Sequence, residues 1–309
     1  MKTYLVPDGL AGGRVDATLA TITGLSRAKC AELVEGGQVR LDGARPKNST
    51  RVAAGSVLEV ELPGEEPVVR ETPVDGMGVI FEDEDIIVVD KPAGVAAHAS
   101  QNFDGPNVLG ALLASGVRLT TSGPQERQGI VHRLDVGTSG AMVVAKSERA
   151  YSGLKHAFRE RRVKKIYHAL VQGLPDPMSG TVDAPIGRDM RHQWKMGIRA
   201  DGKHAITHYD VVESMAGAAL VEVHLETGRT HQIRVHMSAI KHPCLGDVMY
   251  GADPVQAEKL GLERQWLHAV RLGFEHPTTG HYIEFESQYP ADLEHALEIV
   301  REGMYEVRP

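Results

Sequence analysis

The chain has 309 residues, enough for about two domains, and 42% of them are hydrophobic, 24% charged and 5% aromatic. This composition is that of a globular protein and excludes a disordered, collagen-like or coiled-coil chain. Its two cysteines, Cys30 and Cys244, lie far apart in the sequence, so we predict neither a disulfide framework nor a cysteine zinc site. Charged residues interrupt the first 23 positions and no apolar run approaches the ~20 residues of a membrane span, so we expect a soluble, cytoplasmic protein.

The formal net charge is −7, from 34 basic and 41 acidic residues, and this total disfavours a nucleic-acid partner. The charge is unevenly distributed, however. Residues 146–203, here called the basic segment, carry 13 basic and 6 acidic side chains, whereas residues 63–126 carry 3 and 11. An acidic total therefore leaves room for a local anion-binding surface.

Residues 14–62 are predicted to form a small unit of two helices and a hairpin. Apolar residues at every third or fourth position from Val15 to Ile22 predict the first helix. Ser26 is a suitable N-cap for the second helix. Alternating residues on either side of the Asp42-Gly43 turn then predict a strand hairpin.

A polar stretch rich in proline and glycine, PGEEP at residues 63–67, predicts a linker. We therefore predict a first domain over 1–62, a linker over 63–76 and a second domain over 77–309.

The first unit resembles the S4 domain, a small RNA-binding module. The resemblance lies between Gly13 and Leu62, where the matching residues are Arg14, Ser26, Arg27, Gly37, Val39, Gly43 and Lys47. In that family the helices and their basic residues face RNA. The resemblance implies this role for the basic side chains Arg14, Arg27, Lys29, Arg45 and Lys47. From spacing alone, a solvated charged face is an equal alternative.

From residue 77 onward, strand-like alternation predominates. We predict strands over 79–81 and 86–89, a helix over 107–115, and a strand, turn and strand over 130–145. A helix capped by Ser147, strands over 165–170 and 219–225, and a final hairpin over 266–285 follow. Neighbouring hairpins with interspersed helices indicate an α+β domain built on a mixed, largely antiparallel sheet.

The sequence lacks the motifs of several common enzyme classes. It contains no GxxxxGK[ST] phosphate loop, no HExxH and no GxSxG, so nucleotide hydrolysis, zinc-protease and α/β-hydrolase chemistry lose their main sequence support. The histidines are not spaced as metal ligands, since His231 and His236 are five apart and fall on different helical faces. We expect no metal and no cofactor.

Polar residues gather in the stretch GIVHRLDVGTSGAMVVAK at residues 129–146. The apolar pair Ile130-Val131 predicts a strand that brings His132, Arg133 and Asp135 to its end. Charged groups at the end of a buried strand are costly, and functional carboxylates tend to lie at such positions. From this segment alone, an Asp–Arg pair that braces a turn is the favoured alternative.

A second polar stretch is LETGRTHQIRVHMSAIKHPCLGDVMYG at residues 225–251. Thr230 is a candidate N-cap for a helix whose first turns carry His231 and Arg234 on one face. A guanidinium there suits a nearby carboxylate or phosphate. An exposed arginine without a partner is the alternative.

These two stretches together resemble the RluA-type pseudouridine synthases. Three further stretches match that family: IIVVDKPAGVAAH at 86–98, KKIYHALVQG at 164–173 and WLHAVRLGFEHP at 266–277. Five ordered motifs at compatible spacing cover the chain from about Val79 to its end. The resemblance implies a pseudouridine synthase fold and, together with the S4-like module, the branch of the family that acts on large-subunit ribosomal RNA.

The resemblance also implies a role for individual residues. Asp135 corresponds to the catalytic carboxylate and Arg234 to its ion-pair partner. Tyr167 would stack on the target base, and Leu267 would close the apolar side of the pocket. Arg133 would fill the gap that the displaced nucleotide leaves in the RNA stack. His132, beside Arg133, is a further candidate substrate contact.

Such an enzyme converts uridine to pseudouridine, so the base must leave the RNA stack before it reacts. The basic segment then offers phosphate contacts on either side of Tyr167, chiefly through Arg161, Arg162, Lys164 and Lys165. The partner is therefore RNA, most simply ribosomal RNA, bound by a monomer.

Three alternatives remain open at this point. A member of the same family could act on transfer RNA. A non-catalytic RNA-binding protein would use Asp135 structurally. A glycoside hydrolase would need a second carboxylate, for which Asp247 and Glu226 are candidates.

Overall fold

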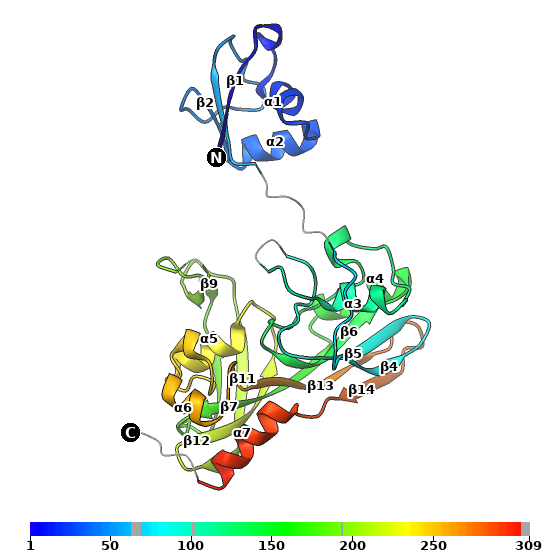
Figure 1. The fold of residues 1–309 in the computed structure, drawn as a ribbon, viewed down its shortest axis with the longest axis vertical. Coiled ribbons are helices and arrows are strands. Elements are labelled where there is room, and N and C mark those ends of the chain that lie inside the picture. The colour runs from blue at the N-terminus through cyan, green and yellow to red at the C-terminus, as the bar shows by residue number, and fades with distance from the viewer. Residues whose placement is uncertain (63–68, 101–102, 193, 304–309) are drawn as a thin grey trace. The chain divides into compact units, whose positions relative to one another are not determined.

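The computed structural model describes residues 1–62, 69–100, 103–192 and 194–303 (Figure 1). Contacts divide the chain into two compact units, Met1–Glu66 and Pro67–Pro309. Each unit is described by itself below. The predicted linker over 63–76 lies partly outside the described residues.

The N-terminal unit packs two helices on a three-stranded sheet. The helices are α1 (Val15–Thr23) and α2 (Arg27–Glu35), and the short turn η1 (Asp8–Leu10) precedes them. The strands are β1 (Lys2–Leu5), β2 (Val39–Leu41) and β3 (Val57–Val60), with β3 in the centre. The predicted helices and hairpin are confirmed, and the oxygen of Ser26 accepts the Lys29 N–H at 3.2 Å as an N-cap. Strand β1 was not predicted.

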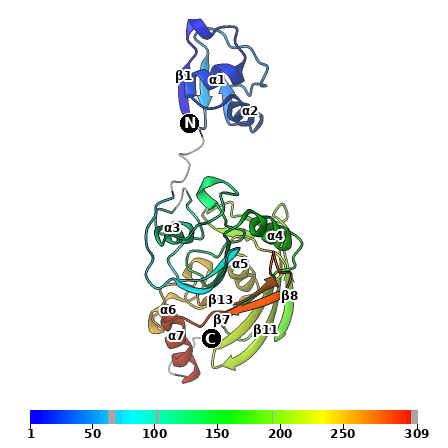
Figure 2. The same ribbon diagram turned by 90° about the vertical axis from the view of Figure 1, so that its right-hand side faces the viewer.

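The described residues of the C-terminal unit form a nine-stranded sheet in the order β4-β5-β6-β13-β7-β12-β11-β8, with β14 paired to β13. Its strands are β4 (Gly78–Glu82), β5 (Ile86–Lys91), β6 (Ser139–Ala145), β7 (Lys164–Gln172), β8 (Ser179–Asp183), β11 (Ile206–Met215), β12 (Ala218–Leu225), β13 (Leu267–Glu275) and β14 (Tyr282–Glu286). Only β6 and β13 pair in parallel among these strands. The expected mixed, largely antiparallel sheet is therefore confirmed. Figure 2 shows the edge that β11 and β8 form.

Helices cover both faces of this sheet. They are α3 (Val108–Ala114), α4 (Glu148–Arg159), α5 (Gln232–Ala239), α6 (Pro254–Lys259) and α7 (Ala291–Arg301). Successive strand residues point to opposite faces, and Leu170 and Leu220 pack with α6 and α7, whereas Ala169 and Val221 pack with α3 and α5. Figure 1 shows α7 beside β12 and α4 near β6. Two short turns, η2 (Gln125–Arg127) and η3 (Val248–Tyr250), and a small hairpin, β9 (Ile186–Arg188) with β10 (Met196–Ile198), complete the unit.

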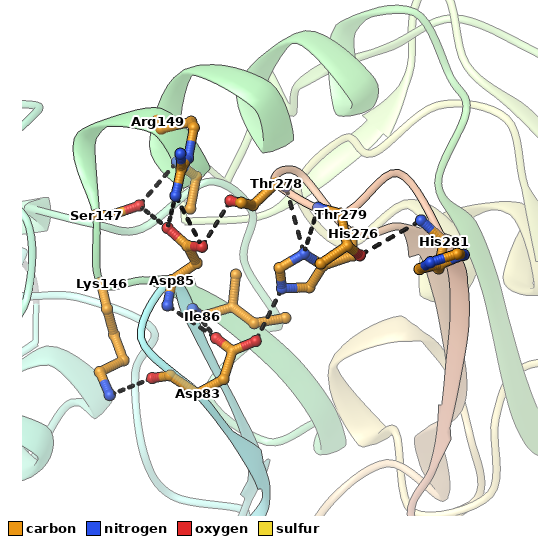
Figure 3. Close-up of polar contacts among 11 residues, drawn as sticks. Asp83, Asp85, Ile86, Lys146, Ser147, Arg149, His276, Thr278, Thr279 and His281 are labelled. Atoms are coloured by element: carbon orange, nitrogen blue, oxygen red, sulfur yellow. Dashed lines mark hydrogen bonds and ion pairs between the residues drawn. The ribbon is translucent and has the colours of Figure 1, made fainter.

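A polar cluster ties three turns of the C-terminal unit together (Figure 3). The Asp85 carboxylate, before β5, accepts hydrogen bonds from Ser147 at the start of α4 and, at 2.6 Å, from Thr278 in the β13–β14 turn. These bonds, that of Ser147 above all, hold the pKa of Asp85 below its ordinary value. His276 bonds Asp83 at 2.9 Å in the same cluster. The cluster fixes the ends of β4, β5 and β13 relative to α4.

Two local predictions are wrong. Ile130 makes a single bridge to Val144, and the stretch that follows is an irregular loop rather than a strand. Helix α5 begins at Gln232, after His231 at φ 56°, and Thr230 does not cap it. The Gln232 side chain instead organises the preceding loop, because its oxygen accepts from Thr227 at 2.7 Å and from the Arg229 N–H at 3.0 Å.

Within the part of the chain that the structure describes, no helix combines the length and the apolar character required to cross a membrane.

Candidate active site

The C-terminal unit contains a cavity of about 590 Å³, here called the first cavity. This volume is typical of small-ligand sites. Segments far apart in the sequence line it: the loop before β6, strand β7, the loop before α5 and the start of β13. The predicted residues that line it are His132, Arg133, Asp135, Arg161, Lys165, Tyr167 and Leu267.

Arg234 of α5 connects two carboxylates beside this cavity. Its Nε and Nη2 donate to the two oxygens of Asp247 at 2.7 and 2.9 Å. Its Nη1 lies 3.7 Å from an oxygen of Asp135. Burial opposes the positive charge, but the hydrogen bonds that Arg234 donates to Asp247 and the charges of both carboxylates outweigh it and raise the pKa of Arg234. The guanidinium is therefore a fixed cation aimed at Asp135.

Tyr250 supports the same guanidinium from its ring face. The Arg234 guanidinium carbon lies 4.8 Å from the ring centroid, a cation–π contact. The Tyr250 hydroxyl bonds the Nδ1 of His231 at 2.7 Å and accepts the Met196 N–H at 3.0 Å. Tyr250 thus joins α5 to the β9–β10 hairpin.

A buried lysine holds the loop that carries Asp135. The Lys91 ammonium, at the end of β5, donates to the carbonyls of Pro92 at 2.9 Å, Val95 at 2.7 Å and Val136 at 3.4 Å. Burial lowers the pKa of Lys91 to about 7, and the charge of Asp135 opposes that shift. Since Val136 follows Asp135 directly, this ammonium fixes the backbone next to the carboxylate.

The apolar side of the cavity comes from β7 and β13. Tyr167 is buried, and burial together with the charge of Asp135 raises the pKa of its phenol, which stays neutral. Leu267 is also buried and starts β13, where it pairs with Ala169, two residues beyond Tyr167. The two side chains line the cavity together with Asp135.

Cations dominate the polar part of the lining. Arg127, Arg133, Arg159, Arg161, Lys165 and Arg229 line the cavity. The acidic residues of the lining are Asp135 and Glu226. Glu226 is already paired with His208 at 2.8 Å and with Arg161 at 3.2 Å. Burial, with the neighbouring Arg161 and Arg229, lowers the pKa of Lys165 to about 8. The cavity is therefore suited to an anionic ligand.

His132 lines the cavity but is held by structural contacts. Its Nε2 accepts the Val143 N–H at 3.0 Å, and its ring stacks on Phe158 at a centroid distance of 4.7 Å. Burial lowers its pKa to about 3, so the ring is neutral.

Two basic residues of the predicted set lie away from the cavity lining. Arg162 pairs with Glu275 at 3.2 Å and Lys164 with Glu284 at 3.1 Å. Arg161 and Lys165 are thus the members of that set which the structure brings to the cavity.

The basic residues predicted for the N-terminal unit are held by several local contacts. Arg14 and Arg27 pair with Asp16 at 3.1 and 3.2 Å, and the hydrogen bond from Arg14 is the main reason that the pKa of Asp16 falls to about 2. Lys29 pairs with Glu32 at 3.1 Å on α2. Arg45 and Lys47 line a cavity of about 510 Å³ together with Arg14.

Sequence reasoning missed the roles of Asp247, Lys91 and Arg229. The sequence offers Asp247 only as a second carboxylate for glycoside hydrolysis, whereas in the structure its carboxylate binds Arg234. The available signal was weak but present: all three residues lie in quoted motif stretches, and Lys91 ends an apolar strand. Among the described residues, no group of three His, Cys, Asp or Glu side chains could hold a metal ion.

Comparisons with known proteins identify the family. A family model described as RNA pseudouridylate synthase matches residues 85–239. The chain belongs to this family, and it is an RNA pseudouridine synthase. The matched range includes Asp135, Tyr167 and Arg234, and the family excludes the non-catalytic and glycoside hydrolase alternatives.

Relatives extend over most of the chain. An uncharacterised RNA pseudouridine synthase of Mycobacterium bovis is 59% identical over 97% of this chain and 98% of its own length. A protein of Zymomonas mobilis named ribosomal large subunit pseudouridine synthase D is 39% identical over 92% of each chain. The solved structure of human RNA pseudouridylate synthase domain containing 4 is 28% identical, with a TM-score of 0.57 over 72% of this chain and 93% of that chain.

The geometry predicts that Asp247 supports the reaction by holding Arg234. Asp247→Asn removes the charge from a hydrogen bond to a cation, an interaction that contributes about 1.5–3 kcal/mol. Because every 1.36 kcal/mol corresponds to about tenfold in rate, we expect kcat for tritium release from RNA labelled at carbon five of uridine to fall about 10- to 150-fold.

The control is Glu213→Gln, which weakens the exposed Glu213–Arg301 pair (2.6 Å) outside the cavity lining. This variant should keep kcat within about twofold, as expected for an exposed pair. Equal kcat values for Asp247→Asn and the wild type would contradict the role of Asp247.

Proposed function

We propose that this pseudouridine synthase modifies uridine in large-subunit ribosomal RNA and that Asp135 is its catalytic carboxylate. The observation that carries the second part is the position of Asp135, 3.7 Å from the fixed cation of Arg234 in a cavity that Tyr167 and Leu267 also line. The first part is supported by relatives of Zymomonas mobilis, Xanthomonas campestris and Neisseria meningitidis that are 38–39% identical and are named ribosomal large subunit pseudouridine synthase D.

The chemistry needs one carboxylate and no co-reactant. Isomerisation breaks the bond between the uracil nitrogen and the ribose, turns the base, and joins the same ribose carbon to carbon five of uracil. Carbon five loses its proton to the solvent, and the freed nitrogen takes up a proton, so the isomerisation balances. Asp135 serves either as a nucleophile or as a base for a ribose proton. In both cases the Arg234 guanidinium, 3.7 Å away, balances the charge of Asp135.

The remaining side chains of the first cavity would bind the displaced nucleotide. Tyr167 offers an aromatic face for the uracil, and Leu267 an apolar contact on the other side. Extruding a base costs a few kcal/mol of stacking and pairing, and Arg133, which lines the cavity, would occupy the vacated position in the RNA. His132 would act indirectly. The hydrogen bond that its Nε2 accepts from the Val143 N–H holds the first part of the 129–146 stretch in place.

RNA would approach over the cations that surround the cavity. Arg161 and Lys165 would bind phosphates at the cavity, with Arg162 and Lys164 on the same chain segment as more distant contacts. Phosphate contacts of this kind weaken steeply with salt.

The N-terminal unit would act as an S4-like RNA-binding module over residues 1–62, followed by a linker over 63–76 and the catalytic domain over 77–309. Two helices on a small sheet, with Arg14, Arg45 and Lys47 around one cavity, support this role. Arg27 and Lys29 on α2 would add further contacts. We propose a cytoplasmic monomer, with which two unpaired, buried cysteines agree.

Asp135→Ala should abolish tritium release from a large-subunit ribosomal RNA transcript labelled at carbon five of uridine. RNA binding should stay within about threefold, because the removed group is an anion among cations. Asp210→Ala, an exposed position on β11, is the control and should keep full activity.

Residual release by Asp135→Ala at the wild-type rate would exclude Asp135 as the catalytic group. Release by the wild-type enzyme from transfer RNA transcripts but not from ribosomal RNA would exclude the proposed substrate.

The pKa of Lys165 predicts a pH effect on RNA binding. Its folded-state pKa is about 8, so the cation is nearly complete at pH 7 and mostly lost at pH 9. We expect the Kd for the same transcript to rise about two- to tenfold over this range at constant salt. Loss of the single Lys165 cation can change Kd by no more than about tenfold between these pH values. Lys165→Arg keeps the charge and should flatten this rise.

Lys164→Arg is the matched control, because Lys164 pairs with Glu284 and does not line the cavity. It should show the wild-type rise of Kd with pH. The same rise in Lys165→Arg as in the wild type would show that another group titrates.

A further inference from the structure

A second cavity, of about 740 Å³, adjoins the first. The two share several lining residues, including Arg133, Arg229 and His231. His231 bonds Tyr250, which supports Arg234. The second cavity therefore lies directly beside the proposed catalytic group, with two cations in the common wall.

Aromatic and cationic side chains line the second cavity. Trp194, just before β10, is 66% exposed although tryptophan is a large apolar residue. Phe103 comes from a separate loop, and its ring lies so close to Gly105 that a Cβ there would be 2.3 Å from the ring. Arg188 and Lys203 add positive charge. An exposed indole beside cations is the composition of sites that bind nucleobases and phosphates.

The acidic residue of this lining does not offset that charge. Asp201 is paired with both Nε and Nη2 of Arg199, at 2.7 and 2.6 Å. The lining thus keeps a net positive charge from Arg133, Lys203 and Arg229. This charge favours a polyanion over an apolar or basic peptide.

The hairpin next to Trp194 is anchored to the catalytic region. Ile186 of β9 exchanges two backbone hydrogen bonds with Lys203, at 2.9 and 2.8 Å. The approach is close, since a Cβ on Gly202 would lie 2.6 Å from the Ile186 carbonyl carbon. Met196 of β10 donates to the Tyr250 hydroxyl and packs in the same small core. The position of Trp194 is therefore tied to Tyr250 and through it to Arg234.

We propose that the second cavity binds a nucleobase of the RNA other than the target uridine, stacked on the indole of Trp194. Arg229, in the wall between the cavities, would contact the phosphates that connect this nucleotide to the target. The inference rests on the proposed catalytic role of the first cavity. A second bound base would hold the RNA strand in register while the uridine occupies the first cavity.

The first test compares Trp194→Ala with Met190→Ala in tritium release. The substrate is total RNA labelled with uridine tritiated at carbon five, taken from cells that lack this enzyme. Met190 is 82% exposed and lies outside both cavity linings, so it is the matched control. Loss of one base–aromatic stack predicts at least about a fivefold increase of KM for Trp194→Ala.

Since Trp194 does not line the first cavity, where the uridine would react, kcat should stay within about twofold. Trp194→Phe keeps an aromatic face and should hold KM within about threefold of the wild type. An unchanged KM for Trp194→Ala, or an equal increase for Met190→Ala, would overturn the proposal while leaving the activity intact. Absence of release by the wild-type enzyme would instead contradict the function on which the proposal rests.

Tryptophan fluorescence gives a readout that does not depend on turnover. The chain has two tryptophans, and Trp266 is fully buried with its N–H bonded to the Leu293 carbonyl at 2.8 Å. Stacking of a base on Trp194 should therefore quench the exposed component when the same RNA is added to Asp135→Ala enzyme. The quenching should vanish in the double variant that carries both Asp135→Ala and Trp194→Phe. Equal quenching with and without Trp194 would overturn the stacking assignment.

Discussion

The contact between Arg234 and two carboxylates is the interaction on which the site depends. Two nitrogens of the guanidinium donate hydrogen bonds of 2.7 and 2.9 Å to Asp247. Its third nitrogen lies 3.7 Å from an oxygen of Asp135. A bidentate pair fixes the plane of a guanidinium as well as its position. Asp247 and Tyr250 thus fix the position of the guanidinium before any substrate binds. The positive charge beside Asp135 is therefore in place without reorganisation.

The fold supplies this arrangement from separate elements. Asp135 lies in a loop whose backbone the buried Lys91 holds, whereas Arg234 comes from α5, packed on the same sheet face. Tyr250 then links α5 to the β9–β10 hairpin, since it bonds His231, which lines both cavities, and Met196, which lines the second. The acidic total of the chain is compatible with RNA, because the cations concentrate around these cavities.

Strand-like alternation in the sequence predicted most of the sheet. The family resemblance named Asp135, Tyr167 and Leu267, which lie in the lining of the first cavity, and their roles stay predictions. Local patterns failed where tertiary contacts decide the structure. The Ile130-Val131 pair has strand propensity, yet only one bridge forms there, and Thr230 has capping chemistry, yet bonds of Gln232 determine where α5 starts. The hydrogen bond between Arg234 and Asp247 joins residues that are 13 positions apart and separated by a loop. The periodicity of the sequence does not reveal such a contact.

A double-mutant cycle tests the central claim most directly. It measures kcat for tritium release in the wild type, Asp247→Asn, Arg234→Lys and the double variant. If Asp247 acts by holding Arg234, its substitution costs much less once the guanidinium is gone, and the cycle should give a coupling of about 1.5–3 kcal/mol. Two effects that add within about 0.5 kcal/mol would contradict this account, since sites without shared contacts behave in that way.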